Sequence, residues 1–220
     1  MIPLRSTERV YATTLVTGGL IVLNLLIFIY QETLSPYELN NLVYQWGIVP
    51  DERPFRVATL LTSMFLHGSW MHVLGNMLYL WVFGRNMEDL VGGVRFLLFY
   101  ILCGLAAAAA QVMISPYSRV PTIGASGAIA GVMGAYLIRF PRARIITLVF
   151  FFFITTLELP AAFVLLFWFA LQFLDSLVSG TNYTGGGVAY FAHIGGFIAG
   201  MLLIRLFPVR RRWRSWYVDE

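Results

Sequence analysis

The chain has 220 residues, of which 59% are hydrophobic and only 12% are charged, with 15 basic residues against 11 acidic ones. Water-soluble globular proteins carry roughly 25% charged side chains, so the composition excludes that class and indicates a protein of the lipid bilayer. At about 20 residues for each membrane-crossing helix, the chain has room for six spans, loops and short tails. We therefore expect a single membrane domain over residues 1–220, with its core at about 60–207.

Five segments are long and apolar enough to cross a membrane, and a proline defines a sixth. Pro160 interrupts the apolar stretch 145–178, and proline is favoured in the first turn of a helix. We therefore place the fifth span at 160–178 and expect residues 145–157 at the membrane interface. The predicted spans, in chain order, are 11–30, 70–87, 94–113, 124–140, 160–178 and 188–207. No small-residue cleavage pattern follows the first, so we expect it to be retained.

The arginines predict the orientation of these spans, because cytoplasmic loops accumulate basic residues. In a six-span arrangement only Arg53, Arg56 and Arg119 lie outside, and the other 12 of the 15 basic residues lie inside. A seventh span through 145–157 would move the C-terminal arginines to the outside. We therefore predict an all-α polytopic membrane protein, a bundle of six transmembrane helices with the N- and C-termini in the cytoplasm.

Residues 208–220 form a basic cytoplasmic tail in this arrangement. Arginines crowd the tail beside tryptophans, at Arg210, Arg211, Arg212, Trp213, Arg214 and Trp216. This mixture suits an anionic membrane surface better than a nucleic acid. We therefore expect anionic lipid and no nucleic acid as a partner of the tail. The short loops favour a prokaryotic cell membrane, the inner one, and the oligomeric state stays open.

Polar side chains inside a membrane span are costly and indicate function. Four of them, His72, Asn76, Ser126 and His193, lie in spans two, four and six within one depth band below the outer surface. Asn76 follows His72 by one turn on the same helix face, and His193 lies about 9 Å below the outer end of its span. Glycines near Ser126 and His193 remove side chains from spans four and six, so the two helices can approach closely.

A serine and a histidine in contact supply the chemistry of acyl transfer. We expect His193 to take the Ser126 proton as general base and to return it to the leaving amine as general acid. His72, Asn76 and the backbone N–H of Ser126 can donate hydrogen bonds to the oxyanion. Asp175, the only acid in the outer half of a span, is a weak candidate for orienting His193.

Other interpretations of these residues stay open. Glycine motifs also serve helix packing alone, and membrane histidines also relay protons, so a transporter or channel could use His72 and His193 as a proton path. We expect His67 to anchor the outer loop, and Glu88 and Asp89 to pair with arginine or to cap backbone groups. The sequence holds neither the HExxH motif of a zinc protease nor a pair of membrane aspartates, which excludes these two other protease chemistries. We expect neither metal nor cofactor.

Three segments, in fixed order, resemble the rhomboid family of intramembrane serine proteases: HGSWMHVLGNMLYLWVFGRNMED at 67–89, GASGAIAGVMGAYL at 124–137 and AHIGGFIAG at 192–200. The resemblance covers about residues 60–201. It implies Ser126 as the nucleophile, His193 as its base, and His72 with Asn76 in the oxyanion hole. It also implies cleavage of membrane-anchored substrates at or just within the membrane face, with span five and the loop 179–187 as a gate.

Two positions depart from the family pattern. The Trp-Arg pair usual in the outer loop is replaced by Phe55 and Arg56, which are displaced along the chain relative to His67. Some members place an aromatic ring one turn after the serine, where this chain has Ala130. A catalytically silent binding member of the same fold is a further alternative, although such members usually lack the serine or the histidine present here.

Overall fold

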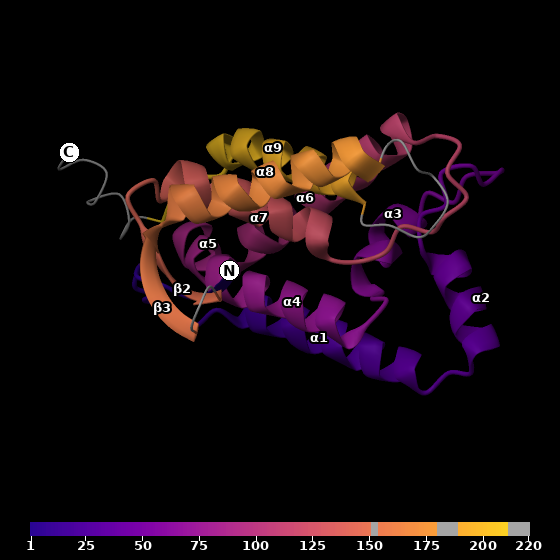
Figure 1. Ribbon diagram of the computed structural model, residues 1–220, viewed down its shortest axis with the longest axis horizontal. Coiled ribbons are helices and arrows are strands. Elements are labelled where there is room, and N and C mark those ends of the chain that lie inside the picture. The colour runs from indigo at the N-terminus through magenta and orange to yellow at the C-terminus, as the bar shows by residue number, and fades with distance from the viewer. Residues whose placement is uncertain (151–153, 180–188, 211–220) are drawn as a thin grey trace.

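The computed structural model describes residues 1–150, 154–179 and 189–210, which form a bundle of helices with a small sheet at one end (Figure 1). The helices are α1 (Leu15–Glu32), α2 (Pro36–Trp46), α3 (Thr59–Thr62), α4 (Trp70–Tyr79), α5 (Arg85–Val91), α6 (Gly93–Ile114), α7 (Ser126–Arg139), α8 (Ala161–Ser179) and α9 (Tyr190–Leu203). Short 3-10 turns occur at Ser63–Phe65 and Ile204–Leu206, and a π-helical segment at Leu80–Gly84 joins α4 to α5.

The helices follow the predicted spans with some differences in length. Within the described residues, α1 and α6 are the two helices both long and apolar enough to cross a bilayer alone. The predicted second span is divided into α4 and α5 by the π-helical segment. Helices α7 and α9 have 14 residues each, which is about 21 Å of helix. Helix α8 begins directly after Pro160, as predicted. The count of six spans and the sidedness of the termini stay predictions.

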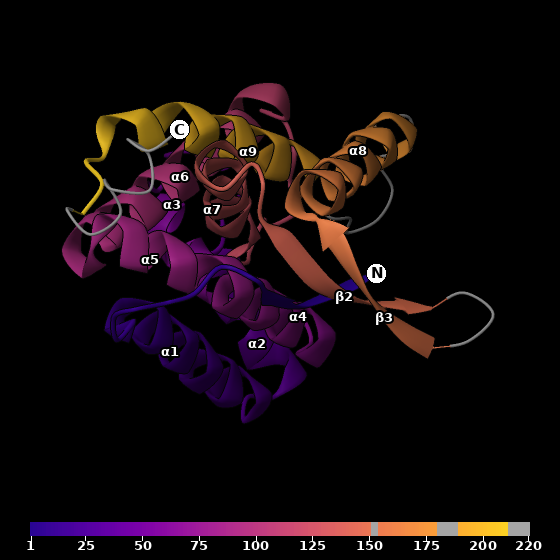
Figure 2. The same cartoon turned by 90° about the vertical axis from the view of Figure 1, so that its left-hand side faces the viewer.

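The expectation of an all-α fold is wrong at residues 145–157. This segment contributes to β2 (Arg144–Phe150) and β3 (Ile154–Pro160), which pair antiparallel, and β1 (Ile2–Ser6) pairs with the other edge of β2. The segment is rich in β-branched and aromatic residues, which fit a pleated surface, and the N-terminal strand supplies hydrogen bonds that an interfacial segment would lack. Figure 2 shows the hairpin extending below α8 and away from the helices.

Helix α7 lies in the middle of the bundle, next to α6 and α9 (Figure 2). Its contact with α9 is backbone to backbone, because a Cβ atom added at Gly200 would collide with the carbonyl group of Gly131, and one at Gly196 with that of Gly127. On its other side, a Cβ atom at Gly127 would strike the side chain of Ala107 in α6. The predicted close approach of these two glycine-rich helices is therefore confirmed.

Two buried acids fix the beginning of α1. Glu88 accepts hydrogen bonds from the backbone N–H of Val16 (3.0 Å) and from the N–H and hydroxyl of Thr17 (both 2.7 Å). Asp89 accepts from the backbone N–H of Tyr11 (2.8 Å). Of the two predicted roles, pairing with arginine or capping, Glu88 has the capping role, which satisfies N–H groups that a helix start leaves without partners.

Candidate active site

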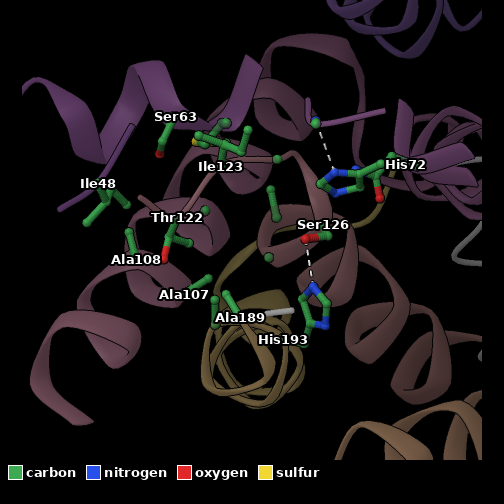
Figure 3. Close-up of a pocket in the computed structure, with 18 of the residues that line it drawn as sticks. Ile48, Ser63, His72, Ala107, Ala108, Thr122, Ile123, Ser126, Ala189 and His193 are labelled. Carbon is green, nitrogen blue, oxygen red and sulfur yellow. Dashed lines mark hydrogen bonds between the residues drawn. The ribbon is translucent and has the colours of Figure 1, made fainter. Parts of the chain in front are cut away.

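Ser126 and His193 meet at the beginnings of two helices. Ser126 is the first residue of α7, and His193 lies in the first turn of α9. The Oγ atom of Ser126 is 2.6 Å from Nε2 of His193 (Figure 3). This distance is within the range of about 2.6–3.2 Å that proton transfer requires. The glycine contacts between α7 and α9 make it possible, because they let the two backbones approach.

The chain bends into α7 at Gly124, which has a positive φ of 121°. A Cβ atom there would lie 2.8 Å from Nε2 of His72 and 3.7 Å from Oγ of Ser126, so glycine is needed for both conformation and space. The bend brings the His72 ring to the side of Ser126 opposite His193, as Figure 3 shows. It also leaves the Ser126 backbone N–H at the positive end of the helix dipole.

His72 is held in the first turn of α4. The hydroxyl of Ser69 accepts a hydrogen bond from the His72 backbone N–H (3.2 Å), and Nδ1 of His72 accepts a long one from the Gly68 N–H (3.5 Å). A neutral imidazole whose Nδ1 accepts carries its proton on Nε2. Nε2 is the atom close to Gly124, so His72 can donate a hydrogen bond toward the space beside Ser126.

Asn76 contacts a histidine that the sequence did not connect with it. Its Nδ2 atom is 3.0 Å from Nε2 of His67. His67 is buried, and this burial, with a smaller effect of the neighbouring His72, lowers the pKa of His67 to about 3. The neutral His67 ring accepts one N–H of the Asn76 amide, and the amide has a second N–H for another acceptor.

The backbone of His67 is clamped by Gln31 at the end of α1. The His67 N–H donates to Oε1 of Gln31 (3.0 Å), and Nε2 of Gln31 donates to the His67 carbonyl (2.9 Å). These contacts fix the outer loop through the backbone of residue 67, so the expectation that the His67 side chain anchors this loop stays a prediction, and the contacts of His67 with Asn76 and Gln31 were missed. The position of His67 in the same motif as His72 and Asn76 was a usable signal, whereas nothing in the sequence marked Gln31.

An aromatic ring from α8 contacts the candidate base. The ring of Trp168 lies 5.7 Å from the His193 ring, centroid to centroid, at an angle of 39°. Ala130 occupies the position where some family members place such a ring, and it is buried. Trp168 was not foreseen, because its contact depends on how α8 packs against α9 and not on a sequence motif.

Two further predicted features can be located only in part. The side chain of Asp175 and residues 180–188, which include most of the proposed gate loop, lie outside the described residues.

Arg56, which resembles the arginine of the family's outer-loop pair, forms an ion pair with Glu52 and donates to the carbonyl groups of Gln45 (2.8 Å) and Tyr44 (3.0 Å). It ties the outer loop to α2 and does not reach Ser126.

A cavity of about 780 Å³ opens beside Ser126 and His193. Its walls combine the four predicted polar residues with Trp168 and with small side chains from α6, α7 and the loop before α7, among them Gly104, Ala107, Ala108, Gly127 and Ala128. Such a lining, mostly apolar with a few convergent polar groups, is typical of a binding site. The cavity can hold a peptide segment next to the serine hydroxyl.

The fold and this cavity define a class, a helical membrane protein with a serine and a histidine in contact at the heads of two packed helices. Comparison with known families agrees, because residues 54–210 match the Rhomboid domain. The chain therefore belongs to the rhomboid family, which consists of polytopic integral membrane proteins.

Individual relatives cover the chain to different extents. It is 30% identical over 169 residues to the mitochondrial Rhomboid protein 1 of Saccharomyces cerevisiae, which is 74% of this chain and 42% of the relative. It is 44% identical over 78 residues to Rhomboid protease GluP of Bacillus subtilis, 36% of this chain and 15% of the relative. Inactive rhomboid protein 1 of Drosophila melanogaster matches at 27% over 99 residues. The chain spans less than half the length of these relatives, and they include an inactive member.

Proposed function

We propose that this chain is an intramembrane serine endopeptidase that cleaves membrane-anchored, single-span proteins at or just within the outer membrane face. The observation that carries the proposal is the contact of 2.6 Å between Ser126 Oγ and His193 Nε2. Membership of a family that contains proteases supports it. The retained serine and histidine argue against a silent binding protein.

The reaction follows from this contact. His193 Nε2 accepts the hydroxyl proton as Ser126 Oγ attacks the scissile carbonyl carbon, and the carbonyl oxygen becomes an oxyanion. The C–N bond then breaks, the leaving amine takes the proton from His193, and an acyl-enzyme ester remains on Ser126. A water molecule, deprotonated by His193, attacks this ester, and the second product leaves with the proton returned to Ser126.

Three donors are available for the oxyanion. The Ser126 backbone N–H at the start of α7, Nε2–H of His72 and the second amide N–H of Asn76 belong to residues that line the same cavity. One such donor is typically worth about 2.7–4 kcal/mol of the barrier. Because Gln31 holds the loop at His67 and the His67 ring holds the Asn76 amide before substrate arrives, little reorganisation is needed during the reaction.

The arrangement in the membrane is part of the proposal. We place six spans with both termini in the cytoplasm, in the inner membrane of a prokaryotic cell, with the basic tail 208–220 on anionic lipid. Substrate enters laterally between α8 and α4, and α8 with the loop 179–187 acts as the gate. A covalent link between α8 and α4 should then block cleavage of membrane substrates, and undiminished turnover of the linked protein would exclude this gate.

The test of the proposal is digestion of a purified single-span substrate by the purified protein in detergent and in vesicles. We expect Ser126→Ala and His193→Ala each to lower cleavage by more than about a thousandfold, with unchanged melting temperatures. Ser118→Ala is the matched control, because among the described residues the Ser118 hydroxyl hydrogen-bonds only to a loop N–H, that of Val120 (3.3 Å).

Two other results would contradict the proposal. Ion flux in vesicles without any cleavage would indicate the transporter or channel. Capture of the substrate without cleavage by the unaltered protein would indicate a binding member of the family.

A further inference from the structure

A second cavity, of about 360 Å³, lies between the N-terminal segment and the helix that continues from α4 into α5. Its lining comes from residues 4–10 and from Trp81, Val82, Arg85 and Asn86, and it shares no lining residue with the active-site cavity. Arg85 follows Asn76 by nine residues on this helical stretch, which corresponds to about 13 Å along the axis. This cavity therefore belongs to the other end of the bundle.

The cavity is lined by three arginines, Arg5, Arg9 and Arg85. The Nε atom of Arg85 is buried without a hydrogen-bond partner, and its guanidinium lies over the Trp81 ring, 4.2 Å from the centroid. Arg5 and Arg9 form no ion pair with any residue that the structure describes. Three guanidinium groups thus line one cavity without an ion pair in the described parts of the chain.

The acids near this cavity do not neutralise it. Glu88 accepts hydrogen bonds from the backbone at the start of α1, and Asp89 accepts them from the backbone of Tyr11 and Ala12 just before it, so both acids are occupied elsewhere. Glu8 is the one carboxylate in the lining, and partial burial raises the pKa of Glu8. With three arginines and one glutamate, the lining carries an excess of two positive charges at neutral pH.

We propose that this cavity binds the phosphate of an anionic phospholipid headgroup. The half-buried guanidinium of Arg85 would be its inner donor, and Arg5 and Arg9, both exposed, would complete the site at the entrance. The planar guanidinium fork matches phosphate oxygens in a bidentate way, and basic pockets beside membrane helices bind acidic headgroups.

The apolar neighbours of the arginines favour a lipid over a soluble phosphate. Trp81 is 47% exposed and Leu4 is 39% exposed at the same cavity. Tryptophan is enriched at the level of the lipid headgroups, and these two surfaces can contact the glycerol backbone and the first methylenes of an acyl chain. A free phosphate would leave both uncovered.

The bound lipid would join two elements that are distant in sequence. Arg5 belongs to β1, whereas Arg85 begins α5. Among the described residues, Asn86 of α5 donates a hydrogen bond to the carbonyl of Glu8, which follows β1 (3.1 Å). A ligand that binds only the folded chain raises its melting temperature. Anionic lipid is therefore expected to stabilise the purified protein.

The experiment measures lipid retention by native mass spectrometry and the melting temperature in detergent, using phosphatidylglycerol, phosphatidylcholine and inorganic phosphate as probes. We expect phosphatidylglycerol alone to be retained and to raise the melting temperature. Arg85→Gln should weaken its binding about tenfold, the order of one charge-assisted hydrogen-bonded pair. Arg85→Lys should give an intermediate value, because the charge remains and the fork is lost.

The matched control is Arg95→Gln, which removes an exposed arginine outside the cavity. In the part of the chain that the structure describes, this arginine hydrogen-bonds only to the Val91 carbonyl (3.5 Å). It should change lipid binding less than twofold. Arg5→Gln and Arg9→Gln, at exposed positions, should each weaken binding severalfold and provide the test if Arg85→Gln does not fold. Equal weakening by Arg95→Gln and the cavity variants, equal binding of phosphatidylcholine, or binding of inorganic phosphate alone would overturn the proposal.

Discussion

The two ends of the bundle handle polar groups in opposite ways. Around Ser126, neutral groups pair with each other, the hydroxyl with His193 and the Asn76 amide with His67. At the other end the groups are charged, and Glu88 is paired with backbone N–H groups. A buried neutral pair costs far less than a buried charge. The comparison teaches that this fold places the candidate catalytic pair where charge is absent, and the acids that hold the start of the chain where charge is concentrated.

The largest effect on cleavage that the comparison predicts is that of Asn76→Ala. This substitution removes one neutral hydrogen-bond donor from the end of the bundle that holds Ser126. Asn76→Ala should lower kcat by about a hundredfold to a thousandfold, the cost of one oxyanion donor, with a smaller change in KM. Steady-state cleavage of a single-span substrate measures both. Asn41→Ala, which removes an exposed amide on α2, is the control. A variant at Asn76 with kcat within threefold of the original would remove it from the oxyanion hole.

The helix contact that positions the neutral pair can be tested at Gly200. Gly200→Ala forces a Cβ atom into the carbonyl group of Gly131 and should destabilise the protein by about 3 kcal/mol, the upper end of typical overpacking. Denaturant unfolding in detergent measures this change. Gly19→Ala is the control, because a Cβ atom at Gly19 meets nothing within 4 Å. Equal stability of the two variants would show that α7 and α9 are not in close contact.

At the charged end, the expected effect is on stability and not on chemistry. Glu88→Gln weakens three charge-assisted hydrogen bonds to the start of α1 and should cost about 1–3 kcal/mol. Glu158→Gln breaks an ion pair with Arg144 that is half exposed, which is worth at most about 1 kcal/mol. The unfolding midpoint should therefore decrease more in Glu88→Gln than in Glu158→Gln. A larger decrease in Glu158→Gln would argue against the capping role of Glu88.

The smallest effect is expected at Trp168, which contacts His193 but donates nothing to it. Trp168→Ala should lower kcat roughly threefold to tenfold, in line with about 0.5–1.5 kcal/mol for an aromatic contact, whereas Trp168→Phe should retain most of the activity. Phe163→Ala is the control, since Phe163 is 51% exposed on the same helix. A rise in cleavage by Trp168→Ala would indicate that this ring restricts substrate entry instead of positioning His193.

The sequence was sufficient to predict which helices carry the site. Ser126 and His193 each lie among glycines, and the small residues needed for close helix contact are visible in the sequence because few other residues can replace them. The close approach of α7 and α9 followed from this pattern. The order of the three motifs then placed His72 and Asn76 on a third helix of the same end.

Features that depend on distant partners could not be predicted in the same way. The apolar residues 145–157 would suit a span, an interfacial segment or a strand. The pairing of β2 with β3 and with the N-terminal strand β1 decides for the strand. The contact of Trp168 with His193 depends on packing between α8 and α9. The π-helical segment at Leu80–Gly84 has no signature in residue type, since Leu, Trp, Val and Phe also fit an ordinary helix.

The π-helical segment at Leu80–Gly84 lies between the residues of the two ends, with His72 and Asn76 before it and Arg85 and Glu88 after it. A wider turn holds one residue more than a regular one, and each residue of an α-helix accounts for about 100° of rotation. The segment therefore sets the angle about the helix axis between the residues that precede it and the residues that follow it. Deleting a single residue within it would rotate one group against the other about the helix axis, so the reactive and the charged residues could no longer both face their present partners.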